Sequence, residues 1–474
     1  MAERLEVDIC VVGAGPGGLL VAAAAALLGQ RVALVERGRM GGDCLNYGCV
    51  PSKALIAAAR TAALARSARE FGVVLDEPRI DFARVHAHLQ EIIARLAPQD
   101  SEERFEGLGC KVVRAEARFL APDELEAGKT RIRARRFVIA TGSAPAIPPI
   151  PGLAEAPYLT NESIFELDAL PEHLLVIGGG PMGVELAQAF LRLGARVSLL
   201  EELALLGKED VEAADVVRQA LRRDGASLYE GTKVKRIARA GLSIVAELEC
   251  QGKGETIAGS HLLIAAGRTP DLAGLGLEAA EVAFSPRGIA VDRRLRTTNR
   301  RIYALGDAVG GAQFTHLAGH HAGIVVRNAL FRLPARVDER ALPRVTYSDP
   351  ELAQVGLMEG PARARHGSIR ILRWAFSEND RARIERSCQG FAKAITTRRG
   401  RILGAAIVGA HAGELILPWC LAIRRRLPIG AMAQLIAPYP TLGEINRAVA
   451  GSFFTASLFS ERAKRLVRFL ASFG

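Results

Sequence analysis

Cys44 and Cys49 are the residues with the clearest capacity for chemistry. They lie five positions apart, between Gly41-Gly42 and Pro51-Ser52-Lys53, shortly after a strand–turn–helix–strand pattern. Paired cysteines alternate between dithiol and disulfide, and the thiolate is the reactive species. A zinc site needs about four ligands, and no second pair follows at ligand spacing. The pattern therefore indicates a redox-active pair, and we expect no metal site.

The segment before the cysteines has the features of a dinucleotide-binding turn. The apolar stretch Val7–Val12 predicts a buried strand that leads into G-x-G-x-x-G, formed by Gly13, Gly15, Pro16 and Gly18. The first glycine allows a tight turn, the second lets the backbone approach a pyrophosphate, and the third lets the helix pack on the strand. Glu36 ends the next strand, where an acid is expected to hydrogen-bond the adenosine ribose of the nucleotide.

A second turn of the same kind follows later in the chain. The strand Leu174–Ile177 leads into a turn whose glycines are Gly178, Gly180 and Gly183, and the next strand ends at Glu201. Two such turns predict two dinucleotides, and a flavin with a nicotinamide hydride donor is the usual reason to hold both. An acid at the position of Glu201 binds a ribose 2′-hydroxyl and repels a 2′-phosphate. We therefore predict NADH rather than NADPH.

Composition indicates an ordinary globular enzyme. A chain of 474 residues is long enough for about three domains. No apolar run is long enough to span a membrane, and the first apolar run lacks the basic flank of a signal peptide. The seven cysteines are scattered rather than arranged as a secreted framework, so we expect a cytoplasmic protein. The net charge of +11 comes from dispersed, mostly arginine residues, and we expect no nucleic-acid binding.

The order of predicted elements suggests four segments. Residues 1–149 hold the first dinucleotide unit, with helices expected over Arg79–Gly107, and a proline-rich linker ends them. Residues 150–271 hold the second unit, and residues 272–342 return to the first domain. Residues 343–474 change to short strands (345–347, 369–376, 390–397 and 402–408) followed by helices from Gly413 and Ile429. This predicts an α/β protein with two Rossmann-like domains and a C-terminal α+β interface domain.

The whole chain resembles the class I pyridine nucleotide-disulfide oxidoreductases, the family of glutathione reductase, dihydrolipoamide dehydrogenase and mercuric reductase. The motifs occur in family order: Gly13–Gly18, Cys44–Lys53, Ala140–Gly142, Gly178–Glu185, Gly306-Asp307, and Tyr439-Pro440-Thr441 with Glu444. The segments Phe314–Gly319 and Asp100–Phe105 resemble the mercuric-reductase-like branch most.

This resemblance implies FAD in the first domain, a nicotinamide cofactor in the second, and a homodimer formed through a dimerisation domain. It implies that Cys49 lies against the flavin and that Cys44 meets the substrate. It implies an ion pair of Lys53 with Glu185 near the site of hydride arrival, and contacts of Asp307 with the ribityl chain. The remaining positions that match cofactor-binding motifs are Gly42, Asp43, Thr141, Gly142, Gly306, Gly267 and Arg268.

Tyr439 is the main departure from the disulfide reductases, which have histidine there, followed by the acid matching Glu444. Tyrosine has an ordinary pKa near ~10 and is a poor base at neutral pH, whereas histidine titrates near ~6.5. Mercuric reductases also have tyrosine at this position. The sequence ends without their vicinal cysteines, so we expect no delivery of mercury by the tail. Asp43 is a smaller departure, because the family often has threonine there.

Three functions remain open. The first is a dithiol enzyme that reduces a disulfide or a thiol-bound metal ion. The second is a flavin-centred diaphorase that reduces quinones or dyes. The third is a redox subunit docked to a membrane or protein partner through Leu458–Phe473, a stretch with apolar residues on one helical face and basic residues on much of the rest. Packing of this stretch on the dimer is the favoured interpretation of the tail, and His316, His320 and His321 are expected to pack beside the cofactor.

Overall fold

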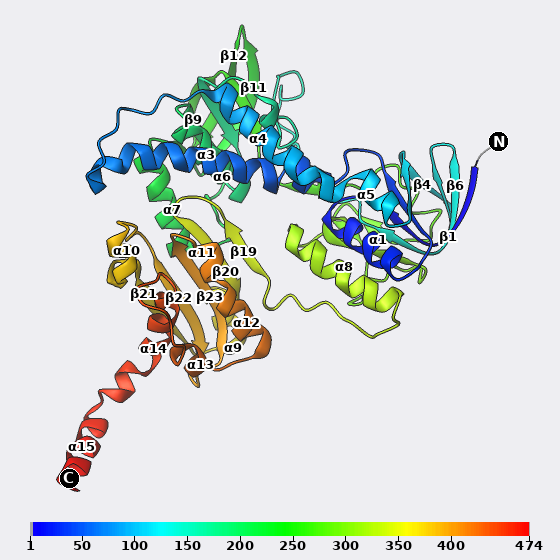
Figure 1. The fold of residues 1–474 in the computed structure, drawn as a ribbon. Helices are drawn as coiled ribbons and strands as arrows, with labels where there is room; N and C mark the ends of the chain where they lie inside the picture. The colour runs from blue at the N-terminus through cyan, green and yellow to red at the C-terminus, as the bar shows by residue number, and fades with distance from the viewer. Residues whose placement is uncertain (1–2, 474) are drawn as a thin grey trace. The chain divides into compact units, whose positions relative to one another are not determined.

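The computed structural model describes residues 3–473, and the chain divides into two compact units. Unit 1 comprises Met1–Gly178, Ala189–Leu200 and Lys233–Val337; unit 2 comprises Gly179–Gln188, Glu201–Thr232 and Asp338–Gly474. Figure 1 shows the helices and strands of both. Across residues 3–473, no helix combines the length and the apolar character needed to cross a bilayer.

The main sheet of unit 1 is the scaffold of the first dinucleotide turn. Its order is β3-β2-β1-β6-β5-β4, and β18 also pairs with β6. The parallel strands are β1 (Glu3–Val12), β2 (Val32–Glu36), β3 (Cys110–Arg114), β6 (Thr130–Ile139) and β18 (Ile302–Ala304). The antiparallel edge consists of β4 (Ala117–Ala121) and β5 (Glu124–Ala127).

Both faces of this sheet are buried, which explains the continuous apolar run in β1. Cys10 and Val12 belong to the core on one face, and Ile9 and Val11 to the core on the other. The helices α1 (Pro16–Leu27) and α8 (Thr315–Ala329) contribute to the second core. Strands of a parallel sheet covered on both sides are expected to be apolar throughout. The predicted Rossmann-like architecture is confirmed here.

The second dinucleotide turn follows a smaller parallel sheet. In it β8 (His173–Ile177) pairs with β9 (Arg196–Glu201) and with β14 (His261–Ile264). Helices α6 (Pro181–Arg192) and α7 (Val211–Asp224) alternate with these strands, and β10 spans Ser227–Glu230. An antiparallel sheet follows, made of β11 (Thr232–Ala240), β12 (Ser243–Cys250) and β13 (Lys253–Gly259). Short strand pairs are β7 (Ser143–Pro145) with β15 (Arg268–Pro270) and β16 (Phe284–Ser285) with β17 (Gly288–Ile289).

The cysteines lie on two helices, α2 (Gly42–Asn46) and α3 (Cys49–Ser67). The region expected to be helical from Arg79 to Gly107 contains two helices, α4 (Phe82–Leu96) and α5 (Glu102–Gly107). A 3₁₀ turn over Ala97–Asp100, with a proline in its first turn, separates them. Ser101 then starts α5 by accepting a hydrogen bond from the Arg104 amide, as N-cap residues do.

Unit 2 contains an antiparallel five-stranded sheet with the order β19-β20-β23-β22-β21. The strands are β19 (Pro343–Thr346), β20 (Glu351–Gly356), β21 (Ile369–Ala375), β22 (Phe391–Thr397) and β23 (Ile402–Gly409). The helices are α9 (Glu359–His366), α10 (Asp380–Ile384), α11 (Ala412–Leu415), α12 (Leu417–Arg425), α13 (Ile429–Ala433), α14 (Glu444–Leu458) and α15 (Glu461–Leu470). The predicted α+β segment is confirmed, and β20 is a strand that the sequence analysis missed.

A buried ion pair connects α7 to the five-stranded sheet within unit 2. The ammonium of Lys393, on β22, lies 2.9 Å from both carboxylate oxygens of Asp210, and the two side chains are 2% and 4% exposed. Asp210 also caps α7 by accepting a hydrogen bond from the Ala213 amide. Removing one partner of such a pair leaves an uncompensated charge in the core.

Lys393→Met is therefore predicted to lower the free energy of unfolding by about 3–5 kcal/mol. The matched control is Arg363→Met, which removes an exposed i,i+4 partner of Glu359 at 2.9 Å and should cost at most about 1 kcal/mol. Chemical denaturation followed by circular dichroism measures both. Equal losses of unfolding free energy in the two variants would show that the buried ion pair stabilises the fold no more than the exposed one.

Candidate active site

The first dinucleotide turn packs tightly against the residue that follows β6. Gly13 has a φ of +103°, and a Cβ atom there would lie 2.3 Å from the Ala140 carbonyl oxygen. A Cβ atom on Gly18 would lie 1.9 Å from the Gly13 oxygen. Gly15 differs, because nothing lies within 4 Å of its added Cβ. The three glycines thus have the expected tight turn, helix packing and open backbone, and Pro16 begins α1.

The second turn repeats this geometry. Gly178 has a φ of +115°, and its added Cβ would lie 2.3 Å from the Ala265 oxygen. Gly180 and Gly267 have nothing within 4 Å, and Gly183 is buried in α6. The repeat predicted from the sequence is therefore present in the backbone.

Glu36 and Glu201, the acids that end β2 and β9, make matching hydrogen bonds. Glu36 accepts from the amides of Ala14 and Gly38, each at 2.6 Å. Glu201 accepts from the amides of Gly179 at 2.7 Å and Leu203 at 2.9 Å. A carboxylate has about four acceptor positions, so each acid can still accept hydrogen bonds from ribose hydroxyls.

The cysteine-bearing segment packs directly on the first turn. The Gly41 amide donates to the Ala14 carbonyl at 3.0 Å. A Cβ atom on Gly42 would lie 2.7 Å from the Cα of Gly15, and Gly42 has a φ of +60°. Only a glycine lets the two backbones approach this closely. The contact holds Cys44 next to the backbone where a pyrophosphate is expected.

Cys44 and Cys49 are thiols that interact with each other. Cys49 is the first residue of α3 and is exposed, whereas Cys44 lies on α2 and is half-buried. A hydrogen bond to Cys49, together with burial, raises the pKa of the Cys44 thiol well above its ordinary value. The Cys44 thiol therefore keeps its proton at neutral pH. The Cys49 sulfur also lies 3.6 Å from the Thr315 hydroxyl.

A chain of polar contacts connects several predicted residues beside the cysteines. The Ser143 hydroxyl donates to Asp307 at 2.6 Å, and Arg268 donates to the same hydroxyl at 2.7 Å. Arg268 also lies 3.3 Å from the Asp43 carboxylate, which accepts a hydrogen bond from Asn161 at 2.9 Å. Burial raises the pKa of Asp307, against the hydrogen bond from Ser143. The aspartate that departs from the family pattern is thus paired with a predicted cofactor residue.

The surroundings of Thr141 test whether FAD fits this site. Its hydroxyl is buried and has no hydrogen-bond partner among the described residues, whereas buried hydroxyls are normally satisfied. Gly142, the next residue, has nothing within 4 Å of an added Cβ. Together with the open Gly15, these features fit a large polar ligand lying along the turn.

His321 has a structural role in this site. It is 2% exposed, and its Nδ1 accepts a hydrogen bond from the Gly306 amide at 3.3 Å. Burial lowers the pKa of His321 to about 4, so the imidazole is neutral at pH 7. His316 stacks on Phe314 with ring centroids 5.1 Å apart. His321 is therefore packed in the core, and the expected position of the histidines beside the cofactor stays a prediction.

Lys53 and Glu185 belong to different units, and their predicted ion pair stays a prediction. Lys53 is half-buried on α3. Glu185 is 5% exposed on α6, and its carboxylate accepts a hydrogen bond from the Tyr347 amide at 2.8 Å. The Glu185 side chain is therefore fixed by the backbone of its own unit.

Tyr439 is 71% exposed, so it does not pack in the core of unit 2. Its hydroxyl donates to Asp380 at 3.1 Å, and this contact raises the pKa of the phenol. Glu444 begins α14 and accepts from the Thr441 amide at 3.5 Å. Tyr439 thus stays a neutral phenol at pH 7, with its hydroxyl proton donated to Asp380, and is not a base.

The sequence analysis did not identify Ser143, Asn161 and Thr315. Ser143 directly follows the Ala140–Gly142 motif, and Thr315 lies within the Phe314–Gly319 segment, so their positions next to motifs were a usable signal. Asn161 reaches Asp43 across 118 residues of sequence, and no local pattern indicates such a contact.

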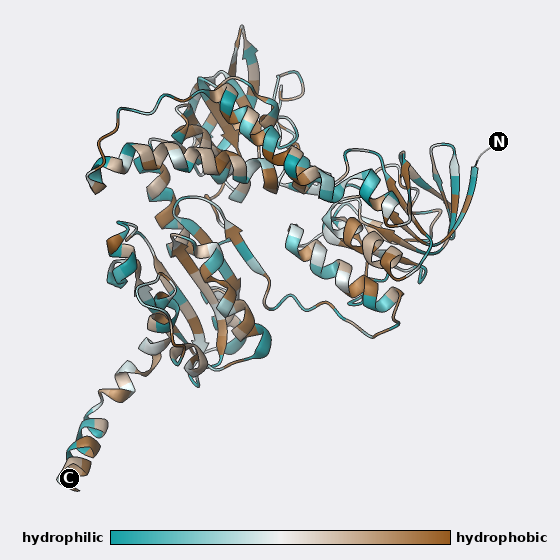
Figure 2. Cartoon of the chain, in the orientation of Figure 1, coloured by the Kyte–Doolittle hydropathy of each residue, from teal (hydrophilic) through white to brown (hydrophobic). Residues whose placement is uncertain are grey.

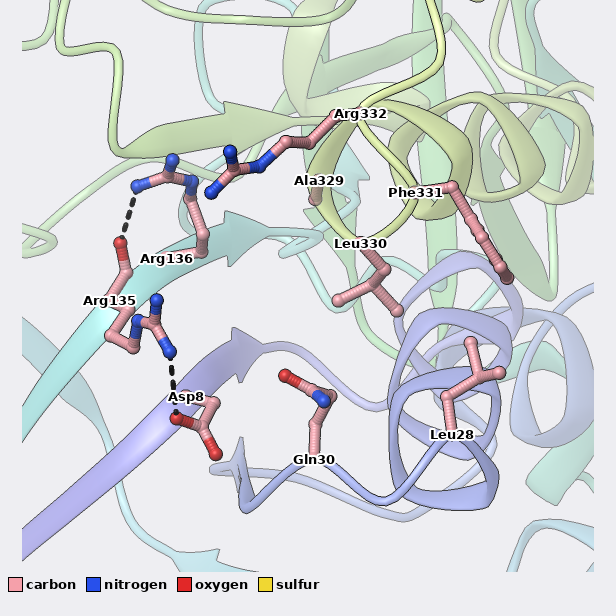
Figure 3. Close-up of a pocket in the computed structure, with 9 residues that line it drawn as sticks. All are labelled: Asp8, Leu28, Gln30, Arg135, Arg136, Ala329, Leu330, Phe331 and Arg332. Carbon is pink, nitrogen blue, oxygen red and sulfur yellow. Dashed lines mark hydrogen bonds and ion pairs between the residues drawn. The ribbon is translucent and has the colours of Figure 1, made fainter.

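A cavity of about 310 Å³ lies elsewhere in unit 1 (Figure 3). Leu28 and Ala329 line it at the C-terminal ends of α1 and α8, whereas the dinucleotide turn meets the N-terminal end of α1. The hydrogen bonds from Arg31 lower the pKa of Asp8 in its wall, and Arg135 lies 3.7 Å from the same carboxylate. The cavity contains none of the predicted site residues.

Substitution of the turn glycines is predicted to separate the two cofactor sites. Gly13→Ala should lose at least about tenfold in flavin affinity, or about 1.4 kcal/mol, because the methyl group would overlap the Ala140 carbonyl. Gly178→Ala should keep its flavin and raise the KM for the nicotinamide. Flavin absorbance and initial rates measure these effects. Gly451→Ala, whose added Cβ meets nothing within 4 Å, is the control, and full flavin content in Gly13→Ala contradicts the assignment.

The geometry can be compared with known proteins. Residues 7–322 match the family described as pyridine nucleotide-disulphide oxidoreductase, and residues 342–449 match its dimerisation domain. The mercuric reductase of Streptomyces lividans is 36% identical over 455 residues, covering 94% of this chain and 96% of that protein. The dihydrolipoyl dehydrogenase of Geobacillus stearothermophilus is 33% identical over 453 residues, with coverages of 94% and 96%.

Solved structures of this class also match. The HOCl-induced flavoprotein disulfide reductase RclA from Escherichia coli, as its Cu(II) complex, has a TM-score of 0.85 at 28% identity and covers 94% of this chain and 99% of that one. LpdA from Mycobacterium tuberculosis has a TM-score of 0.86 at 27% identity, with coverages of 95% and 99%. The dimerisation domain indicates a homodimer. The chain therefore belongs to the pyridine nucleotide-disulphide oxidoreductases, a family of FAD-dependent enzymes that take electrons from NAD(P)H.

Proposed function

We propose that this protein passes electrons from NADH through FAD and a Cys44–Cys49 redox disulfide to a disulfide or thiol-bound metal-ion acceptor. The observation that carries the proposal is the packing of the cysteine-bearing segment on the first dinucleotide turn, through Gly42 against Gly15. In this proposal residues 1–149 and 272–342 bind FAD, residues 150–271 bind the nicotinamide, and residues 343–474 form the dimer.

In this proposal Cys44 and Cys49 carry the electrons from the cofactors to the acceptor. When bound, the two cofactors would supply one hydride equivalent, whose electron pair reduces the disulfide. The Cys44–Cys49 disulfide takes up two electrons and two protons and becomes two thiols. Cys44 then gives up its proton, and its sulfur attacks an acceptor disulfide; one acceptor sulfur leaves with that proton as the first thiol, and the other stays bound to Cys44 as a mixed disulfide. Cys49 gives up its proton in turn and attacks the Cys44 sulfur, which releases the second thiol and restores the internal disulfide.

The hydrogen bond between the two sulfurs holds a proton on Cys44, and Cys44 must lose this proton before its sulfur can attack an acceptor. Together with burial, this hydrogen bond raises the pKa of the Cys44 thiol. Cys49 is the exposed member of the pair at the N-terminus of α3, and this fits a sulfur covered by a bound cofactor ring. Thr315 at 3.6 Å holds the Cys49 sulfur in place.

The names of the similar proteins suggest two classes of thiol-reactive acceptor. The similar proteins are named mercuric reductase and dihydrolipoyl dehydrogenase, and one structural neighbour is a Cu(II) complex. A soft metal ion bound by two thiolates and a small disulfide both suit a pair of neighbouring thiols such as Cys44 and Cys49. The chain offers no histidine at the position of Tyr439, which favours the metal ion over the lipoyl disulfide.

A flavin-centred diaphorase is the second candidate, and the state of Tyr439 favours it. Thiol–disulfide exchange with a lipoyl group needs a base near neutral pH. The contact with Asp380 raises the pKa of Tyr439 instead. A quinone or dye accepts electrons without such a base, so reduction of these compounds does not require the cysteines.

Substitution of the cysteines distinguishes the two candidates. Cys49→Ser and Cys44→Ser should each lower NADH-dependent turnover of mercuric ion or lipoamide by at least about a thousandfold, or about 4 kcal/mol in transition-state free energy. Quinone turnover should stay within a few-fold of wild type. Anaerobic stopped-flow measurement of NADH oxidation gives both rates, with Cys250→Ser as the control. Quinone as the sole acceptor, used equally by all variants, would establish the diaphorase instead.

Substitution of Glu201 tests the choice of nicotinamide. Its carboxylate stands beside the second turn and keeps two acceptor positions for a ribose. We expect wild type to prefer NADH in kcat/KM, and Glu201→Gln to narrow the preference by about tenfold because a neutral amide does not repel a 2′-phosphate. Glu202→Gln, a substitution of the next residue, should leave the ratio of kcat/KM for NADH to that for NADPH unchanged. Equal efficiency of wild type with both donors would refute this assignment.

A further inference from the structure

The helix α15 is the part of unit 2 that its core leaves uncovered. From Thr455 to Phe473 no residue is buried, and the last members of the unit's hydrophobic core, Phe453 and Phe454, come directly before this stretch. Ser460 starts α15 by accepting a hydrogen bond from the Ala463 amide. An isolated helix of ten residues is marginally stable in water, so this helix needs a partner.

The helix has two chemically distinct faces. The apolar face follows the spacing i, i+3, i+4, i+7 and is formed by Ala463, Leu466, Val467 and Leu470, with Phe473 one turn further. Leu466, Val467, Leu470 and Phe473 are between 56% and 73% exposed. Figure 2 shows hydrophobic and hydrophilic segments alternating along α15, as this two-sided pattern requires. One face of the helix therefore exposes a continuous apolar strip.

The rest of the helix is strongly basic. It carries Arg462, Lys464, Arg465 and Arg468 against a single acid, Glu461. Glu461 pairs with Lys464 at 2.8 Å. Within residues 3–473 the three arginines have no acidic partner. The helix thus combines an apolar strip with an excess of three positive charges.

We propose that α15 binds an anionic lipid membrane, lying in the plane of its surface. High amphipathicity, a basic polar face and low overall hydrophobicity are the properties of helices that lie at a bilayer interface. A helix of ten residues is about 15 Å long, too short to span a bilayer. The apolar strip would enter the acyl boundary while the long arginine stems reach back to lipid phosphates.

Charge favours lipid over a second copy of the chain as the partner. The excess of three positive charges on α15 suits an anionic lipid surface, whereas the α15 of a second copy carries the same positive charges. Each basic residue near an anionic lipid surface raises the binding constant of such a segment by about fivefold. Membrane docking would also place the enzyme where lipid-soluble oxidants such as quinones reside.

Vesicle co-sedimentation of the full-length, FAD-loaded protein tests the proposal. The vesicles are phosphatidylcholine alone or with phosphatidylglycerol. Wild type should bind the phosphatidylglycerol vesicles at least about tenfold more tightly than neutral ones. The double variants Leu466→Gln/Leu470→Gln and Arg465→Gln/Arg468→Gln should each lose at least about tenfold in affinity. The matched control is Leu421→Gln/Arg399→Gln, which changes exposed residues of unit 2 outside α15.

Sedimentation velocity and soluble-acceptor turnover of the same proteins separate this proposal from its rival. All variants should stay dimeric and keep wild-type turnover, because α15 contributes nothing to the core of unit 2. Dissociation of the Leu466→Gln/Leu470→Gln variant into monomers would show that a second copy covers the helix. Failure of wild type to sediment with phosphatidylglycerol vesicles, or equal binding to neutral ones, would also overturn the proposal.

Discussion

The close approach of Gly42 to Gly15 is the constraint on which the rest of the site depends. An added Cβ on Gly42 would lie 2.7 Å from the Cα of Gly15, and Gly41 donates to the Ala14 carbonyl. Gly15 is the glycine of the turn that has open space beside it. The same few atoms therefore hold the proposed redox pair and offer backbone to the expected dinucleotide. Electron transfer between a cofactor and a disulfide requires this proximity, and two side chains of ordinary size would prevent it.

The two dinucleotide turns share one hydrogen-bonding arrangement. Each dinucleotide turn is followed by an acid 22 residues after the middle residue of G-x-G, and each acid accepts that residue's amide. The carboxylate thereby fixes the turn and keeps acceptor positions for a ribose. The polar chain from Asp307 through Ser143 and Arg268 to Asp43 occurs beside the first turn. It connects the predicted cofactor residues to the segment that carries the cysteines.

Much of this could be predicted from sequence because the decisive signals are local. The glycine spacings, the apolar run of β1 and the pair Cys44–Cys49 each lie within a few residues, and the family resemblance placed them in order. The contacts of Asn161 with Asp43 and of Lys393 with Asp210 join positions 118 and 183 residues apart, and no local pattern encodes them. The break between α14 and α15 at Phe459-Ser460 was missed for a different reason: the apolar spacing continues through it, and only the Ser460 cap marks the new helix.

The most direct test of the central claim is to follow the two sulfurs themselves. The protein is reduced anaerobically with NADH, alkylated, and analysed by peptide mass spectrometry against the air-oxidised form. The account predicts that Cys44 and Cys49 are protected before reduction and both alkylated after it, while the labelling of Cys250 and Cys388 does not change. Equal labelling of Cys44 and Cys49 before and after NADH would show that electrons do not reach this pair, and the account would be wrong.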